Sequence, residues 1–440
     1  MLRAAATEIV ERLRHAGYEA LFAGGCVRDR LLGTEPADYD IVTSARPHEV
    51  EGLFKNTIPV GRQFGIVVVP QNDHGFEVAT FRSDGCYLDG RRPASVTFSD
   101  AEHDSRRRDF TINAMFEDPL TGELIDYNGG RADLEAGLIR TVGLAQDRFS
   151  EDRLRLLRAV RFAARLGFRI EERTYEALRE QARYINEVSV ERVTAELARI
   201  LTEGHARRGF ELLDEVGLLG PILPELLPMK GCEQDAEFHP EGDVFVHTMA
   251  CLERLPAGCT LTLALGVLLH DVAKPACHES IDGRHLFHGH TREGGVMAEA
   301  ICRRLRVSNA VTARVRFLVE QHLRHCSAPD MKASTLKRFL GQDGIEELLA
   351  LVRIDTESSS GSLDDYELCV QALDDMPPEQ IRPLRLVSGN DLIALGLSPG
   401  PRFKVLLAAV EEAQLEGEVT TREQGLALLA RLVADGPDGS

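Results

Sequence analysis

The stretch from Leu21 to Thr43, LFAGGCVRDRLLGTEPADYDIVT, constrains the fold more than any other part of the chain. An apolar run ends in two glycines, Gly24 and Gly25, and a later apolar pair follows directly after Asp38 and Asp40. If that second segment is a strand, both aspartates point to one face, because side chains alternate along a strand. Two neighbouring carboxylates repel each other, and such oxygen ligands suit Mg²⁺. The stretch therefore predicts a strand edge that holds a divalent cation.

The two glycines and the segment after them predict a phosphate-binding turn. Glycines let backbone N–H groups approach a phosphate without a Cβ in the way. The amphipathic segment that follows carries Arg28 and Asp29. A Gly-Gly pair alone is usually an ordinary turn, and an Asp-x-Asp alone is usually a solvated loop. Their order along one segment, with strand patterns on both sides, favours a functional site.

Composition indicates a globular protein with several domains. The chain has 440 residues, of which 43% are hydrophobic and 28% are charged. No apolar run approaches the length of a membrane span, and the N-terminus lacks the apolar core of a signal peptide. The nine cysteines are scattered without a CxxC pair, which argues for a reducing, cytoplasmic setting and against disulfides or a zinc knuckle.

Hydrophobic periodicity divides the chain near residue 143. Before it, strand patterns alternate with short helices, and a basic cluster at 106–109 leads into FTINAMFED, which we expect to be helical. After it, helical periodicity dominates, apart from an irregular stretch at 217–244 and a short linker at 358–363. We therefore expect an α+β fold, with a mixed head and a long all-helical body. The predicted strands are 18–23, 38–43, 65–70 and 76–82, and the first predicted body helices are 151–166, 173–184, 190–202 and 205–216.

A cluster of arginines stands out against the net charge of −19. Residues 153–173 hold seven arginines against two glutamates, and an arginine recurs every third position from Arg155 to Arg161. Ser150 is a plausible N-cap for this helix. An exposed, salt-bridged helix face is the ordinary interpretation of such a pattern. We name Asp152, Arg155, Arg158 and Arg161 the arginine stripe.

The stripe also carries hydrogen-bonding groups that suit the recognition of nucleobases. Cytosine and adenine both present an exocyclic amine beside an unprotonated ring nitrogen. A carboxylate such as Asp152 accepts from the amine, and a guanidinium such as Arg155 donates to the ring nitrogen. Uracil and guanine present the reverse pattern, and a buried polar group left unpaired against them costs about 1–3 kcal/mol. Arg158 and Arg161 then remain to hold a triphosphate.

Four ordered motifs resemble those of class II tRNA nucleotidyltransferases. They are GGCVRD, DYDI, RRRDFTINAM and EDRLRLLRAVRFAARLGF, and the similarity covers residues 20 to about 230. That family includes CCA-adding enzymes, separate CC- and A-adding enzymes, and bacterial poly(A) polymerases. The resemblance implies a polymerase-β-like nucleotidyltransferase head at 1–143, a helical neck that binds RNA and nucleotide at 144–232, an HD-type helical domain at 243–357, and a helical tail at 358–440.

The resemblance also implies two-metal nucleotidyl transfer from CTP and ATP to the 3′ end of tRNA. Its Mg²⁺ ligands correspond to Asp38 and Asp40, and a third carboxylate, the base for the RNA 3′-hydroxyl, corresponds to Glu77. The nucleotide-binding positions correspond to Gly25, Arg28, Arg108 and the arginine stripe, Asp152, Arg155, Arg158 and Arg161.

The second half carries histidine and carboxylate residues in an order that resembles an HD-type metal-dependent phosphohydrolase. A single surface histidine is common, but His270-Asp271 follows an apolar helix and has further candidates on both sides. The resemblance implies a second divalent metal and hydrolysis of a phosphate monoester or cyclic phosphate. The implied core ligands are His247, His270, Asp271 and Asp355, with His290 and His322 supporting a second ion.

The sequence alone does not decide which nucleotides the enzyme adds. The 23 residues between Arg82 and Arg106 include DGRRP and resemble the flexible loop of full CCA enzymes, which favours CCA or A addition over CC addition. The GR-x-F element of PVGRQFGIVVV resembles poly(A) polymerases, but the net charge of −19 and the lack of a basic tail disfavour that activity. A phosphohydrolase whose head only binds nucleotide is a further alternative, against which the intact aspartate pair argues.

Overall fold

A computed structural model describes residues 1–58, 65–85, 95–237 and 239–434. The GR-x-F element and the DGRRP segment lie outside these residues. The chain forms two compact units. The first comprises Met1–Pro228, Leu255–Gly258 and Arg304–Val307, and the second comprises Met229–Arg254, Cys259–Arg303 and Ser308–Ser440. The finer division into four domains stays a prediction.

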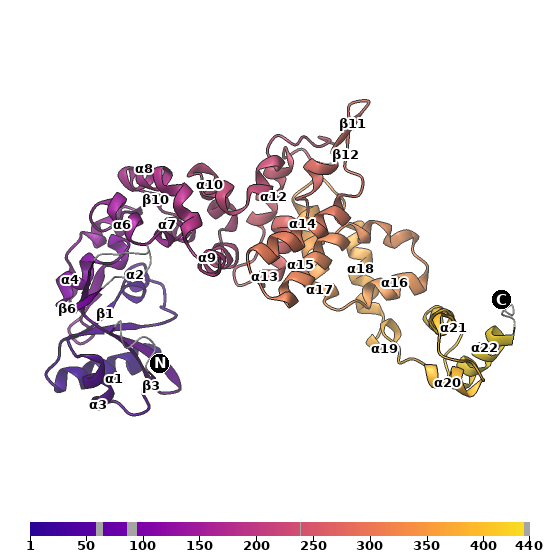
Figure 1. Ribbon diagram of the computed structural model, residues 1–440, viewed down its shortest axis with the longest axis horizontal. Coiled ribbons are helices and arrows are strands. Elements are labelled where there is room, and N and C mark those ends of the chain that lie inside the picture. The colour runs from indigo at the N-terminus through magenta and orange to yellow at the C-terminus, as the bar shows by residue number, and fades with distance from the viewer. Residues whose placement is uncertain (59–64, 86–94, 238, 435–440) are drawn as a thin grey trace. The chain divides into compact units, whose positions relative to one another are not determined.

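A six-stranded mixed sheet forms the centre of the first unit (Figure 1). Its strand order is β3-β4-β2-β1-β7-β8. The pair β2–β4 is parallel, and the other neighbouring pairs are antiparallel. This sheet confirms the predicted α+β class. The strands are β1 (Ala20–Ala23), β2 (Asp40–Thr43), β3 (Ile66–Gln71), β4 (His74–Thr80), β7 (Met115–Glu117) and β8 (Leu124–Asp126).

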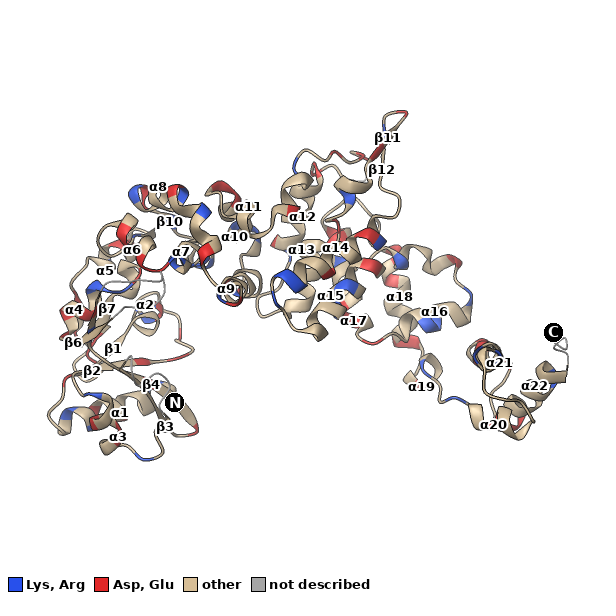
Figure 2. Ribbon diagram, in the orientation of Figure 1, with Lys and Arg blue, Asp and Glu red and all other residues tan. Residues whose placement is uncertain are grey.

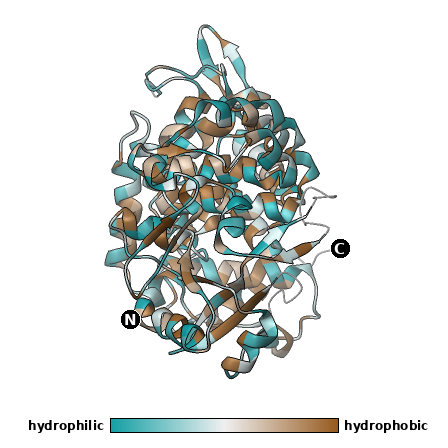
Figure 3. Cartoon of the chain, turned by 90° about the vertical axis from the view of Figure 1, so that its left-hand side faces the viewer, coloured by the Kyte–Doolittle hydropathy of each residue, from teal (hydrophilic) through white to brown (hydrophobic). Residues whose placement is uncertain are grey.

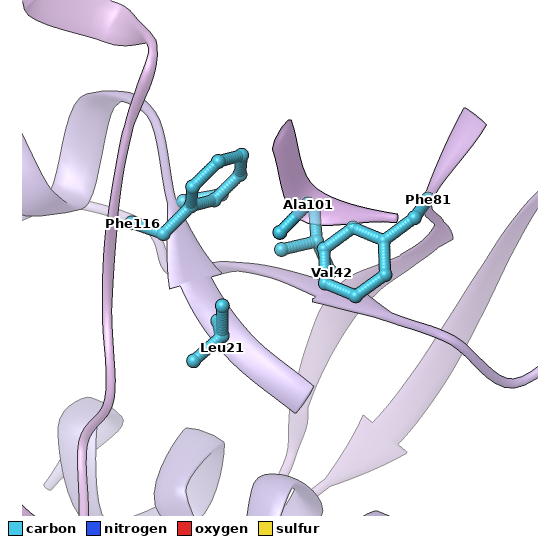
Figure 4. Close-up of a cluster of buried hydrophobic side chains, with 6 residues drawn as sticks. Leu21, Val42, Phe81, Ala101 and Phe116 are labelled. Carbon is cyan, nitrogen blue, oxygen red and sulfur yellow. The ribbon is translucent and has the colours of Figure 1, made fainter. Parts of the chain in front are cut away.

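A buried apolar cluster on the sheet holds β1 and β2 in place. Leu21, Val42 and Phe116 from three strands pack with Phe81 and Ala101 (Figure 4). The rings of Phe81 and Phe116 meet edge to face, with centroids 6.2 Å apart. Each large side chain buried in this way contributes about 1.5–3 kcal/mol. The strands of the head are accordingly mostly brown, or hydrophobic, in Figure 3.

Helices surround and extend this sheet. The predicted helix at 190–202 is confirmed with the same bounds. The smaller elements of the unit are β5 (Arg82–Asp84), β6 (Val96–Phe98), β9 (Leu138–Ile139), β10 (Arg169–Ile170), and the 3₁₀ helices η2 (Thr111–Asn113), η3 (Ala182–Glu187) and η4 (Pro224–Met229). The helices are α1 (Leu2–His15), α2 (Gly25–Leu31), α3 (Pro47–Leu53), α4 (Ala101–Arg106), α5 (Gly130–Glu135), α6 (Ala145–Glu151), α7 (Leu154–Leu166), α8 (Glu172–Gln181), α9 (Val190–Thr202), α10 (Ala206–Glu215) and α11 (Leu219–Ile222).

The helix predicted over FTINAMFED is wrong. Only Thr111–Asn113 is helical, as η2, and the chain then enters strand β7. Phe116 pairs with Ala23 of β1, and its side chain is fully buried. Pairing with β1 and burial in the core therefore outweigh the local helical pattern.

The helix predicted to begin at Glu151 is interrupted. Helix α6 ends at Glu151, and α7 begins only at Leu154. Ser150 lies within α6 and is therefore no N-cap. Asp152 is extended, with φ −144° and ψ 104°, and its Oδ1 accepts from the backbone N–H of Leu154 at 3.0 Å. A local side chain to backbone bond of this kind competes with continuation of a helix.

The second unit is mainly helical but contains a hairpin that the prediction of an all-helical body missed. Strands β11 (Glu279–Ile281) and β12 (Arg284–Leu286) join through Asp282 and Gly283, both with positive φ. Asp-Gly is a typical two-residue hairpin sequence, so this element was detectable. The helical elements of this unit are α12 (Val244–Glu253), α13 (Leu261–Leu269), η5 (Lys274–Cys277), α14 (His290–Arg304), α15 (Asn309–Gln321), η6 (Arg324–Asp330), α16 (Ala333–Leu340), α17 (Ile345–Glu357), α18 (Asp364–Asp375), α19 (Pro378–Ile381), α20 (Gly389–Ala394), α21 (Pro401–Glu416) and α22 (Arg422–Ala434). Among the residues described, no helix combines the length and apolar character needed to cross a membrane.

Candidate active site and histidine cluster

A cavity of about 840 Å³ in the first unit gathers most of the residues that the sequence predicted for nucleotidyl transfer. It brings the aspartate pair, the glycine turn and the arginine stripe to one place, with arginines from α2 and α7 (blue in Figure 2). Its lining includes Gly24, Gly25, Arg28, Asp38, Asp40, Arg108, Asp152, Arg155, Arg158 and Arg161, together with Asp109, Asn113 and Phe162.

Asp38 and Asp40 line this cavity where strand β2 begins, whereas the predicted third carboxylate, Glu77, is not among the lining residues. Asp40 is the first residue of β2, and Asp38 lies just before the strand. The observed strand therefore begins two residues later than the strand predicted at 38–43. The register that pairs Ile41 with Val78 places Glu77 of β4 beside Asp40. Burial, followed by the charges of Asp38 and Glu77, raises the pKa of Asp40 to about 6. Negative charge concentrated in this way fits a bound cation.

The glycine turn approaches these carboxylates closely. Gly24 has φ +74°, and a Cβ there would lie 3.0 Å from Arg108 Nη1 and 3.8 Å from Asp40 Oδ2. Gly25 begins α2, which carries Arg28. This geometry explains why the turn needs glycine at its first position.

Arg28 and Arg108 are both anchored through Asn113. Arg28 Nη1 donates to the Asn113 side-chain oxygen at 2.6 Å, and Arg108 Nη1 donates to the Asn113 carbonyl at 3.2 Å. Arg108 also donates to the buried Asp104 at 3.1 and 3.2 Å. Asn113 and Asp104 were not among the predicted site residues, although Asn113 lies within the RRRDFTINAM motif. Their anchoring function depends on contacts that the motif alone does not reveal.

The arginine stripe is largely buried, which excludes a simple solvated helix face. Arg155 and Arg161 are only 8% and 2% exposed. Arg155 Nη1 donates to Glu151 at 2.6 Å, and Arg161 Nε donates to Glu196 at 2.6 Å. Arg161 Nη1 lies 3.6 Å from Glu203 and makes no hydrogen bond, so it can still donate to a ligand in the cavity.

Asp109 links the RRRD motif to the stripe. Its carboxylate accepts from Arg158 Nε at 2.8 Å. Burial raises the pKa of Asp109, but the charge and hydrogen bond of Arg158, with Arg155 nearby, more than offset it and lower the pKa to about 2. Phe162 packs beneath the stripe, with the Arg161 guanidinium 4.3 Å from its ring centroid.

Asp152 is held from a second helix. Its Oδ2 accepts from Arg192 Nη2 of α9 at 2.8 Å. Arg192 and Glu196 both come from α9, distant in sequence from the stripe that they contact. Sequence reasoning missed them because no local pattern connects the two helices.

The second unit gathers the six residues predicted as HD-type ligands. We call them, with Cys251, the histidine cluster: His247, Cys251, His270, Asp271, His290, His322 and Asp355. All but Asp355 are nearly fully buried, and Asp271, His290, His322 and Asp355 line a cavity of about 510 Å³. Cys251 was not among the predicted ligands.

The imidazoles of this cluster have fixed orientations. The Nδ1 atoms of His270, His290 and His322 each donate to a backbone carbonyl at 2.8 Å. Their Nε2 atoms therefore carry the lone pairs and face the carboxylates of Asp271 and Asp355, from 3.2 to 3.8 Å away. When a histidine binds a metal, the other ring nitrogen typically makes a hydrogen bond of this kind, which orients the ring.

Comparison with known families covers most of the chain. Residues 20–140 match the poly A polymerase head domain, and residues 167–230 match the "probable RNA and SrmB- binding site of polymerase A". Residues 287–430 match tRNA nucleotidyltransferase domain 2.

Individual relatives agree with these matches. The CCA-adding enzyme of Lactiplantibacillus plantarum is 34% identical over 98% of this chain and 96% of its own length. That of Geobacillus stearothermophilus is 47% identical over 48% of this chain and 52% of its own length. The crystal structure of the Bacillus stearothermophilus CCA-adding enzyme in complex with CTP superposes with a TM-score of 0.74, at 29% identity and 98% coverage of both chains. The chain therefore belongs to the family of CCA-adding enzymes, as its class II nucleotidyltransferase motifs predicted.

Proposed function

We propose that this protein adds C and A to the 3′ end of tRNA from CTP and ATP, without a nucleic-acid template, and releases pyrophosphate. The observation that carries the proposal is the convergence of Asp38, Asp40 and the arginine stripe on one cavity. Its relatives are named CCA-adding enzymes, and solved structures of that name hold CTP, ATP or tRNA. The predicted cytoplasmic setting is part of this proposal, and the eight described cysteines are free, as it requires.

Asp38 and Asp40 would hold Mg²⁺, with Glu77 as the third carboxylate beside them. The donor set fits, because these are hard oxygen ligands and Asp40 lies beside two further acids that raise its pKa. Bound Mg²⁺ supplies activation of the RNA 3′-hydroxyl and neutralisation of the leaving pyrophosphate. Glu77, on the neighbouring strand, would accept the proton of that hydroxyl. Gly25, Arg28 and Arg108 would bind the phosphates at the glycine turn.

Asp152 and Arg155 would select the base. The Asp152 carboxylate accepts from the exocyclic amine of C or A, and Arg155 donates to the adjacent ring nitrogen. Arg158 and Arg161 hold the triphosphate, and Arg161 Nη1 is suited to this because it makes no hydrogen bond within the protein. Burial increases the free-energy difference between correct and wrong bases, since a wrong base leaves desolvated polar groups unpaired.

The decisive experiment measures incorporation of each labelled triphosphate into three tRNAs, which end at the discriminator base, at C, or at CC. We expect the full protein to extend all three to CCA, and Asp40→Ala to abolish incorporation. Glu135→Ala, which removes an exposed carboxylate paired with Arg131, is the matched control and should retain activity. Extension only to CC, only by A, or by long A tracts would identify a CC-adding enzyme, an A-adding enzyme or a poly(A) polymerase instead. Incorporation that survives in Asp40→Ala would refute the metal assignment.

A second activity, metal-dependent phosphohydrolysis by the histidine cluster, is favoured by the orientation of its imidazoles. Three Nε2 atoms point at the carboxylates of Asp271 and Asp355, and Asp271 Oδ1 and His290 Nε2 are buried without hydrogen-bond partners. Lys274 Nζ lies 2.8 Å from Asp271 and borders the cavity, where a phosphate would enter. We expect hydrolysis of a phosphate monoester or cyclic phosphate, lost in Asp271→Ala while nucleotide addition persists. Loss of both activities together would argue against a separate centre.

A further inference from the structure

The thiol of Cys251 faces the histidine cluster from the same helix as His247. The two residues are four apart on α12, which places them on one helix face. Cys251 is fully buried, and its Sγ lies 3.4 Å from His247 Nε2. A buried cysteine usually packs as a small apolar side chain, but this one meets imidazole and carboxylate groups.

We propose that Cys251 is a thiolate ligand in a closed zinc-type site, beside a second, open site for another divalent ion. This inference rests on the metal centre proposed above and specifies its composition. The closed set consists of His247, Cys251, His270 and Asp355, and the open set consists of Asp271, His290 and His322.

The spacing within the closed set fits a tetrahedron around one ion. Zinc bonds of about 2.0–2.1 Å to nitrogen and 2.3 Å to sulfur require N–N separations of about 3.3 Å and N–S separations of about 3.5 Å. His247 Nε2 lies 3.3 Å from His270 Nε2 and 3.4 Å from the Cys251 sulfur. Asp355 Oδ1 completes the set at 2.9 Å from His247 and 3.7 Å from His270. All four ligand atoms lie within 4.8 Å of one another.

The hydrogen bonds around the closed set leave it rich in acceptors. His270 Nδ1 donates to the Val267 carbonyl at 2.8 Å, and His247 Nδ1 donates to Glu241 at 2.7 Å. In the neutral imidazoles both Nε2 atoms therefore present lone pairs toward each other and toward the Asp355 oxygen. A single divalent ion would bind these two nitrogens, the thiolate and the carboxylate oxygen together.

Asp271 connects the two sets. Its Oδ2 lies 3.2 Å from His270 Nε2, and its Oδ1 lies 3.5 Å from His290 Nε2 and 3.8 Å from His322 Nε2. Within the described part of the chain, the open set offers three protein ligands and borders the cavity, so it keeps a position for water or a phosphate oxygen.

The ligand chemistry makes the two sites unequal. A thiolate favours Zn²⁺ over Mg²⁺ or Mn²⁺, whereas an all-nitrogen and oxygen set also accepts harder ions. We therefore expect tightly held zinc in the closed set and an exchangeable ion in the open set. The substrate class that fits the open position is a phosphate ester, whose oxygen would bind the exchangeable ion.

Cobalt substitution in the full-length protein tests this assignment. The metal-free protein is titrated with Co²⁺, and absorption spectra and bound metal are recorded. We expect two Co²⁺ at the histidine cluster, in addition to any bound by Asp38 and Asp40, and a thiolate-to-cobalt charge-transfer band in the near ultraviolet. Cys251→Ser should lose the band and weaken zinc binding by more than about 100-fold, beyond the loss typical of an outer-shell change. Cys302→Ser, which alters an equally buried thiol belonging to none of the ligand groups among the described residues, should keep the band.

A second variant, His290→Gln, provides a test whose result does not depend on whether Cys251→Ser folds. His290→Gln should bind one Co²⁺ fewer and keep the charge-transfer band, because it alters only the open set. Cobalt binding without the band in the unaltered protein would overturn the role of Cys251 and leave the proposed metal centre standing. A chain that binds no cobalt would overturn both.

Discussion

Asp152 Oδ2 accepts a hydrogen bond from Arg192 Nη2 at 2.8 Å, which ties the break between α6 and α7 to helix α9. The other Asp152 oxygen accepts from the Leu154 backbone at 3.0 Å. Each carboxylate oxygen can accept a second hydrogen bond, so Asp152 is held in place yet still able to accept from a base. Arg192 is therefore a positioning residue for base selection.

Arg192→Met should impair discrimination between bases more than it impairs turnover. The lost charged hydrogen bond contributes about 1.5–3 kcal/mol, so we expect selectivity for CTP and ATP over UTP and GTP to fall by about 10- to 100-fold. The measurement is kcat/KM for each triphosphate on tRNA ending at CC or earlier. Arg179→Met, which removes an exposed arginine of α8, is the control. Unchanged selectivity in Arg192→Met, or relaxation only in the control, would contradict the positioning role.

Gly24→Ala should damage both stability and activity, whereas Gly25→Ala should leave the fold nearly intact. Gly24 has positive φ, and its added Cβ would press on Arg108 at 3.0 Å. Backbone strain there costs about 1–3 kcal/mol. The Cβ of Gly25→Ala would meet only Arg28 Nη2 at 3.7 Å, an ordinary contact. Denaturant unfolding followed by far-UV circular dichroism compares the two, since the chain has no tryptophan. Equal losses in both variants would show that the φ angle does not decide the outcome.

The parts of the site that lie in one short segment were predictable from sequence. Gly24, Asp38 and Asp40 share a single strand–turn–helix–strand unit, so their proximity follows from local structure. The strand alternation argument was nevertheless incomplete, because β2 begins at Asp40 and leaves Asp38 before it. Local geometry, rather than regular alternation, brings both side chains to the cavity.

The contacts that fix the site come from residues far along the chain and could not be predicted in the same way. Glu196 holds Arg161 from 35 positions away, and Phe116 enters the sheet through its pairing with β1. Such partners depend on tertiary packing, which hydrophobic periodicity does not specify. Cys251 is different, because its position four residues after His247 was visible in the sequence. The spacing alone does not mark it as a ligand, because a buried cysteine more often packs as a small apolar side chain.

Asp109→Asn should remove an acid-dependent part of the stability. The pKa of Asp109 in the folded protein, about 2, lies below its unfolded value near 3.8. The carboxylate therefore stabilises the fold above the unfolded pKa, and this contribution is lost as pH falls through the folded pKa. We expect the unfolding free energy of the unaltered protein to exceed that of Asp109→Asn by about 2 kcal/mol at pH 6, with the difference shrinking between pH 4 and 2. A constant difference across this range would contradict the ion pair with Arg158.

Asp40→Asn should stabilise the protein when metal is removed. The folded pKa of Asp40, about 6, lies above its unfolded value of 3.8, so ionisation of this carboxyl costs stability once the pH rises through that window. With chelator at pH 8, we expect the variant to have a higher unfolding free energy than the unaltered protein, by an amount that solvent screening keeps small, and we expect the two to converge near pH 4. Saturating Mg²⁺ should reduce or reverse the difference, because only the aspartate supplies an anionic ligand. Denaturation curves at pH 4, 6 and 8, with chelator and with Mg²⁺, measure these effects. An unaltered protein equally stable at pH 5 and pH 8 in chelator would show that Asp40 carries no such penalty, and the electrostatic case for a cation between Asp38, Asp40 and Glu77 would fail.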